Sequence, residues 1–145
     1  MSATPAPTTD LAFELRLSAP PVRVFAALTE ADQLARWFCD QAEVEPRVDG
    51  RILMRWSRPG AAHYEGRWVE YDQPRACAHE GGNSTYPGGY SGRVSFALAE
   101  DGGGTRLTIR HQIPARAEYE PFVARYCEAW PRAIARLEEH VGRSG

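Results

Sequence analysis

Residues 19–38, APPVRVFAALTEADQLARWF, predict two short helices between one strand and a long run of strands. Apolar side chains recur at helical spacing in this stretch, at Val24, Phe25, Leu28, Leu34, Trp37 and Phe38. Thr29, followed by Asp32 three residues later, resembles a capping box at the start of the second helix. Because both helices are short, they form a helical corner, unlike the long crossover that joins parallel strands.

The chain before this corner contains one strand. Leu11, Phe13, Leu15 and Leu17 alternate with polar or small residues, which is typical of a half-buried strand. Residues 1–10, MSATPAPTTD, are rich in proline, threonine and alanine and have neither the basic nor the apolar region of a signal peptide. We therefore expect a disordered lead-in over residues 1–10 and one folded domain over residues 11–142.

The middle of the chain predicts one strand after another. Apolar residues alternate within segments 52–56, 94–98 and 107–111. Further strands are expected over 64–71 and 75–80, and a weak one over 43–46. Turn signals such as Asp49-Gly50 and the run EDGGG separate these segments. Consecutive strands joined by short turns indicate an antiparallel sheet of about six to seven strands.

The chain ends in its longest predicted helix. Its apolar face has members at intervals of three or four residues, namely Tyr119, Phe122, Tyr126, Trp130, Ile134, Leu137 and Val141. The polar face is formed by Glu118, Glu120, Arg125, Glu128, Arg136 and Glu139. Pro131 lies inside the pattern and lacks a backbone donor, so we expect a kink or break near residues 127–130.

These elements predict an α+β architecture. The sheet has one apolar face and the C-terminal helix has one apolar stripe, and each buries the other when the sheet curves around the helix. Such a curved sheet leaves a wedge between the two layers. We therefore expect a ligand cavity there.

Five motifs in this order resemble a known family: residues 19–38, VDGRI at 48–52, YEGRWVEYDQP at 64–74, GGTRLTIRH at 103–111 and AWPRAIARLEEHV at 129–141. They are similar to the START-like helix-grip (SRPBCC) superfamily, and within it to bacterial homologues of the activator of heat-shock protein 90 ATPase. The resemblance implies the helix-grip fold. It implies no single function, because this superfamily includes lipid carriers, hormone receptors, polyketide cyclases and co-chaperone domains.

Composition excludes several classes of function. All 17 basic residues among the 145 are arginines, so Schiff-base lysine chemistry and the P-loop are excluded. The net charge of −2, with scattered arginines, predicts no nucleic-acid partner, and no apolar run is long enough for membrane insertion. Without an export signal, Cys39, Cys77 and Cys127 indicate reduced thiols and a cytoplasmic protein. We expect no cofactor.

Large aromatic and sulfur-containing side chains are expected to face the wedge. Two histidines are expected on the inward faces of their strands and join this set. The candidate ligand-binding residues are Trp37, Phe38, Met54, Trp56, Tyr64, Trp68, His79, Phe96, His111, Phe122, Tyr126 and Trp130. One interpretation is a cavity for a flat or elongated apolar ligand. The other is an ordinary packed core, to which such residues also contribute most.

His79 and His111 are the candidate catalytic residues. Two inward histidines are able to form an acid–base pair or, together with Cys77, to bind a soft metal. The spacing supplies no further ligand, so we expect no metal site, and no carboxylate is evidently paired with either ring. His63 and His140 are expected to be solvated.

Residues 81–92, GGNSTYPGGYSG, connect two predicted strands. They match no phosphate-binding pattern and precede a strand instead of a helix. They are therefore either an inert connection or a lid over the cavity, with Tyr86 and Tyr90 as the lid candidates.

Three functions remain open from the sequence. The first is binding of a small hydrophobic or amphipathic molecule, with the ligand unidentified. The second is a co-chaperone-like protein with a chaperone partner, and the third is a cyclase- or hydratase-like enzyme that uses His79 or His111. The oligomeric state is not predicted.

Overall fold

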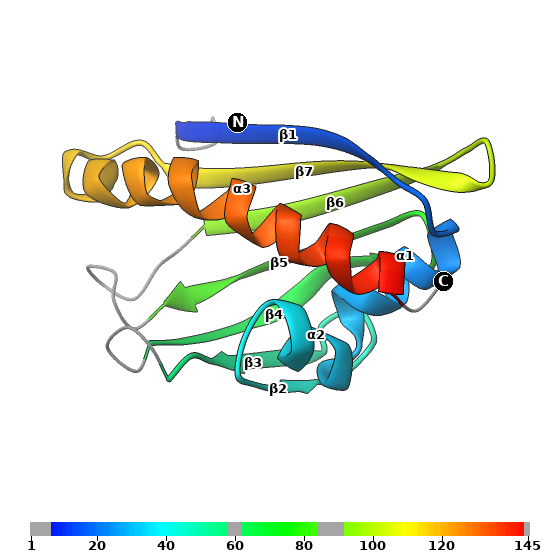
Figure 1. The fold of residues 1–145 in the computed structure, drawn as a ribbon. Helices are drawn as coiled ribbons and strands as arrows, with labels where there is room; N and C mark the ends of the chain where they lie inside the picture. Colours follow the sequence, from blue (N-terminus) through cyan, green and yellow to red (C-terminus); the bar gives the residue numbers. More distant parts are fainter. Residues whose placement is uncertain (1–6, 58–61, 84–91, 144–145) are drawn as a thin grey trace, which may run out of the picture.

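A computed structural model describes residues 7–57, 62–83 and 92–143. Its seven strands form one antiparallel sheet in the order β1-β7-β6-β5-β4-β3-β2 (Figure 1). The strands are β1 (Thr8–Leu17), β2 (Gln41–Val44), β3 (Arg51–Arg55), β4 (His63–Asp72), β5 (Ala76–Asn83), β6 (Gly92–Asp101) and β7 (Gly104–Pro114). The predicted antiparallel sheet of six to seven strands is confirmed.

The helices lie where the sequence places them. Helices α1 (Pro21–Thr29) and α2 (Ala31–Trp37) follow β1 directly, and a single 3-10 turn, η2 (Ala117–Tyr119), leads into α3 (Glu120–Arg143). Helix α3 lies across one face of the sheet, and α1 and α2 lie beside its C-terminal half (Figure 1). This arrangement confirms the predicted helix-grip fold.

The first strand pairs with the last strand of the chain. Its register joins Leu11 to His111 and Leu17 to Thr105. The strand begins at Thr8, so residues 8–10 belong to the sheet and not to the disordered lead-in that was predicted to end at residue 10. The pairing of Thr8 with Pro114 explains the difference, because a partner strand was available there.

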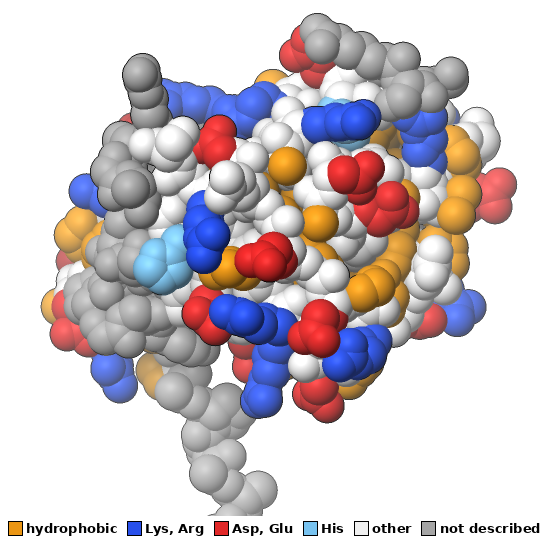
Figure 2. All heavy atoms as spheres, turned by 90° about the horizontal axis from the view of Figure 1, so that it is seen from below, with side chains coloured by type: hydrophobic (Ala, Val, Ile, Leu, Met, Phe, Trp, Pro, Cys, Tyr) orange, Lys and Arg blue, Asp and Glu red, His pale blue; other side chains and the backbone are white. Residues whose placement is uncertain are grey.

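Arginines on the outer side of the sheet pair with acidic side chains. Arg106 binds Glu14 and Asp101, and Arg110 binds Asp10 across neighbouring strands. Charged side chains of both signs are also interspersed across the face shown in Figure 2. Because these pairs are largely exposed, water and salt screen them and each contributes little to stability.

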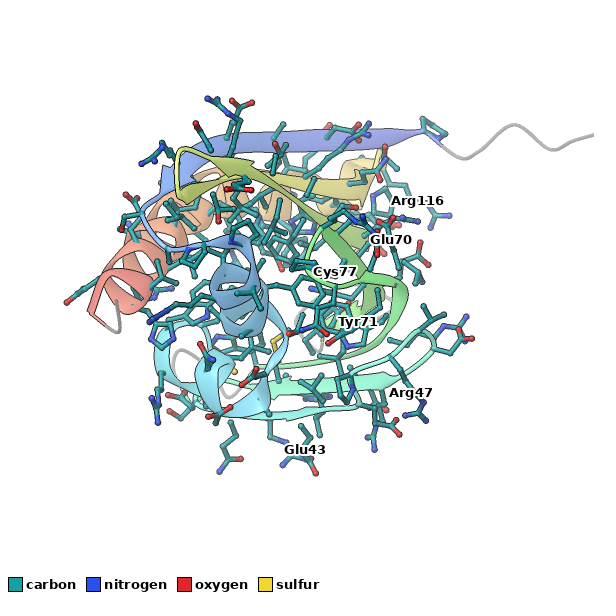
Figure 3. All side chains as sticks on the ribbon, turned by 90° about the vertical axis from the view of Figure 1, so that its right-hand side faces the viewer. Glu43, Arg47, Glu70, Tyr71, Cys77 and Arg116 are labelled. Carbon is teal, nitrogen blue, oxygen red and sulfur yellow. The ribbon has the colours of Figure 1, made fainter. Side chains whose placement is uncertain are left out.

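A bulge in β4 changes the strand's alternation. The register with β5 shifts between Trp68 and Glu70, so Tyr71 turns toward the interior (Figure 3) and its ring packs edge-on against Phe25 at 5.2 Å. The backbone of Trp68 also exchanges hydrogen bonds with the Asp49-Gly50 turn. The extra residue increases the bend of the sheet around α3.

Two details of the helices differ from the predictions. Thr29 forms no capping box, because its hydroxyl donates back to the carbonyl of Phe25 within α1, and Glu30 precedes α2 instead. Helix α3 runs without a break through Pro131. Pro131 is exposed, while Trp130 and Ala133 beside it are buried against the sheet, so packing on the inner face maintains the helix despite the missing donor.

Candidate functional site

A cavity of about 240 Å³ lies between the sheet, α2 and α3. It is lined by Leu28, Leu34, Trp37, Phe38, Ile52, Met54, Trp56, Ala62, Tyr64, Trp68, His79, Val94, Phe96, His111, Tyr126, Ala129, Trp130, Ala133 and Arg136. Alternate residues of β3 to β7 supply one wall, and residues three or four apart on α3 supply the other. Most of this wall is apolar.

The cavity brings together eleven of the twelve residues that were predicted to bind a ligand. The exception is Phe122, near the start of α3, which packs in a separate cluster with Ile113 and Tyr119. Its ring lies 6.4 Å from that of Tyr119 and is covered by the guanidinium of Arg125. Helical periodicity placed Phe122 on the correct face but could not show that this end of the helix has its own small core.

The sequence did not single out Arg136 as a cavity residue. It was assigned to the polar face of α3, yet it lines the cavity with its side chain largely exposed. Its Nε donates to the carbonyl of Trp37 at 3.0 Å, at the end of α2. The signal that could have found it is its position three residues after Ala133, which places it beside the buried stripe.

All four tryptophans of the chain line the cavity. Their indole N–H groups mostly donate to nearby acceptors: Trp37 to the Ala27 carbonyl at 2.8 Å and Trp56 to the Phe38 carbonyl at 2.7 Å. Trp130 donates to Nδ1 of His111 at 3.1 Å. Trp68 is buried, and its Nε1 has no hydrogen-bond partner among the described residues.

His79 is a neutral, buried group in the centre of the wall. Its Nδ1 lies 2.8 Å from the hydroxyl of Tyr64. Burial, reinforced by nearby His111, lowers the pKa of His79 to about 3. The ring of Tyr64 reaches His79 by passing over Gly66, where any Cβ would lie only 2.6 Å from the Tyr64 hydroxyl oxygen.

His111 is also neutral, by a geometric argument. An indole N–H only donates, so Nδ1 of His111 accepts from Trp130 and its proton lies on Nε2. The ring of Tyr126 packs edge-on against His111 at 4.5 Å. Burial raises the pKa of Tyr126 to about 12, so this phenol is also neutral.

The two buried thiols of the core, Cys39 and Cys77, are protonated. Burial, with a smaller effect of Asp40, raises the pKa of Cys39 to about 11, and burial raises the pKa of Cys77 further. A buried, protonated thiol is a poor nucleophile. In the described ranges, no three histidine, cysteine or acidic side chains come together in a way that could hold a metal ion.

The cavity therefore offers apolar surface with a few neutral hydrogen-bonding groups. Such a wall is able to hold a ligand by apolar contact and to orient it through a few hydrogen bonds. The lid candidates Tyr86 and Tyr90 lie outside the described residues. Within the described part of the chain, no helix has the length and apolar character needed to cross a membrane.

Comparison with known proteins decides the family. The sequence profile of the activator of Hsp90 ATPase homolog 1-like proteins matches residues 18–142. The chain belongs to this family. This match confirms the family resemblance that the five sequence motifs predicted. No curated protein matches its sequence.

Solved structures share the fold of this chain. Protein MLL2253 from Mesorhizobium loti has a TM-score of 0.82 at 19% identity, covering 94% of this chain and 99% of that chain. The Aha1 dimer from Colwellia psychrerythraea has a TM-score of 0.78 at 15% identity, with coverages of 92% and 96%. CalU16 from Micromonospora echinospora has a TM-score of 0.74 at 20% identity, with coverages of 92% and 76%. At these identities the likeness concerns the fold alone.

Proposed function

We propose that the chain binds a small hydrophobic or amphipathic molecule in the cavity between the sheet and α3. The observation that supports this function is the wall itself, in which four tryptophans line a cavity of about 240 Å³. Packed protein interiors leave few voids larger than a water molecule. A cavity of this size with an apolar wall is therefore suited to a ligand.

The volume limits the size of the occupant. An apolar cavity of about 150 Å³ is known to accept benzene. The larger cavity of this chain suits a molecule with about two fused rings or a short alkyl chain. The flat faces of Trp37, Trp130 and Phe38 favour an aromatic or planar occupant.

The two other functions receive less support. An enzyme of the cyclase or hydratase type needs an effective general base, yet the pKa of His79 is lowered to about 3 and Nδ1 of His111 already accepts the indole N–H of Trp130. A co-chaperone-like role needs a docking patch. Among the described residues the exposed large hydrophobic side chains are Val22 and Val48, and two valines are too few for such a patch.

Filling the cavity is expected to weaken binding strongly. Ala133 is 4% exposed and lines the cavity, so the ring of Ala133→Phe would enter the space that a ligand needs. We expect the neutral dye N-phenyl-1-naphthylamine to bind the wild-type chain saturably and to bind Ala133→Phe at least tenfold more weakly. Fluorescence titration measures both affinities.

Ala135→Phe is the matched control, because Ala135 lies on the same helix, is exposed and does not line the cavity. This variant should bind the dye as the wild-type chain does. Circular dichroism would confirm that all three proteins are folded. Equal dye affinity for Ala133→Phe and the wild-type chain would contradict the proposal.

A further inference from the structure

The wall of the cavity carries charge of one sign. Among the residues that the structure describes, Arg136 is the one charged side chain that lines the cavity, and no aspartate or glutamate joins it there. A carboxylate there would repel an anionic ligand, and a second arginine would leave the position of a bound anion undefined. The positive charge of Arg136 therefore lies at the rim of the cavity. The interior beside it is uncharged and mostly apolar.

The guanidinium of Arg136 is oriented but not neutralised. Its Nε donates to the Trp37 carbonyl at 3.0 Å, which ties the side chain to the end of α2. Within the described ranges, no acidic group pairs with it and its two terminal nitrogens donate to no protein acceptor. These nitrogens present the parallel donors that a carboxylate accepts in a bidentate manner.

Two further arginines lie near the C-terminal part of α3, on α1 and α2. His140, one turn after Arg136 on α3, lies close enough to Arg36 and Arg23 for their charges to help burial lower its pKa. Asp32 acts on His140 in the opposite direction, with a smaller effect.

We propose that the occupant of the cavity is an amphipathic anion whose carboxylate binds the Arg136 guanidinium while its apolar part lies among the tryptophans. This inference rests on the proposed function and adds the chemical class of the ligand. The interior supplies affinity through apolar burial, and Arg136 supplies selectivity for the anion over a neutral molecule of the same shape.

The test compares two ligands that differ only in charge and head group. Displacement of N-phenyl-1-naphthylamine by 1-naphthaleneacetate and by 1-naphthaleneethanol is measured for the wild-type chain, Arg136→Gln and Arg132→Gln. Arg132 lies one turn earlier on α3 and does not line the cavity, so it is the matched control. We expect the wild-type chain and Arg132→Gln to prefer the acetate about tenfold, and Arg136→Gln to bind both ligands within about twofold.

Salt gives a second measurement that needs no variant. The preference of the wild-type chain for the acetate should fall severalfold between 0.05 and 1 M NaCl, because the rim is partly exposed to solvent. An Arg136→Gln protein that keeps the tenfold preference, or a wild-type preference that is absent or insensitive to salt, would overturn this inference alone. A wild-type chain that binds neither the dye nor either ligand would overturn the proposed function and this inference with it.

Discussion

Replacing Gly66 with alanine is expected to destabilise the chain by about 3 kcal/mol and to separate Tyr64 from His79. A Cβ at position 66 would overlap the carbonyl oxygen of Glu80 on the neighbouring strand and lie 2.6 Å from the Tyr64 hydroxyl oxygen. The Glu80 oxygen belongs to the backbone, so it cannot move aside without shifting β5. The Tyr64 ring can move, but only by giving up its 2.8 Å contact with His79.

Gly142→Ala is the control for this substitution, because a Cβ at position 142 would meet nothing within 4 Å and alanine favours the helix. Urea denaturation of both variants and the wild-type chain gives the free energies of unfolding. Thermal unfolding should show a midpoint lowered by roughly 10 °C for Gly66→Ala only. A Gly66→Ala protein as stable as Gly142→Ala would show that Tyr64 does not occupy the space over Gly66.

The second large effect is a loss of stability in mild acid. His79 has a pKa of about 3 in the folded chain, and an unfolded histidine has a pKa of 6.5. Below pH 6.5 the unfolded chain therefore binds a proton at this residue that the folded chain does not bind, so stability falls as the pH falls toward 3. From pH 7 to pH 5 the free energy of unfolding should decrease by about 2 kcal/mol.

His79→Gln tests the assignment, since glutamine retains a hydrogen-bonding group near Tyr64 but does not titrate. Urea denaturation at pH 7, 6 and 5 should show a much smaller pH dependence for this variant than for the wild-type chain. His140→Gln is the control. The pKa of His140 is also lowered in the folded chain, but this residue is partly exposed, so its replacement should change the pH dependence of stability less. Acidic groups with lowered pKa values, such as Asp10, affect stability only below this range. A wild-type chain equally stable at pH 7 and pH 5 would contradict a buried, neutral His79.

The sequence predicts the fold well because periodicity is a strong signal in this chain. Alternation in β1, β3, β6 and β7 and the apolar stripe of α3 identified the two layers that enclose the cavity. The inward positions of His79 and His111 followed from the same alternation. The two short helices after β1 followed from spacing within residues 19–38.

What the sequence does not predict depends on contacts between distant residues. The bulge at Trp68 turns Tyr71 inward, and simple alternation would have turned it outward. Arg136 belongs to the polar face of α3 by periodicity, and only the packing of α3 against the end of α2 shows that it reaches the cavity. Pro131 predicts a kink or break from local chemistry, yet α3 continues through it without a break while its neighbours pack against the sheet.

The four indole N–H groups give the most direct test of ligand binding in the cavity, because all four tryptophans line it. In nuclear magnetic resonance spectra of the nitrogen-15-labelled chain, each indole gives a separate signal that is sensitive to a nearby aromatic ring. Titration with N-phenyl-1-naphthylamine should shift these signals saturably, with the midpoint found by fluorescence, and should leave them unshifted in Ala133→Phe. Dye fluorescence that rises while the four indole signals stay unchanged in the wild-type chain would place binding elsewhere on the molecule and contradict a ligand-binding cavity.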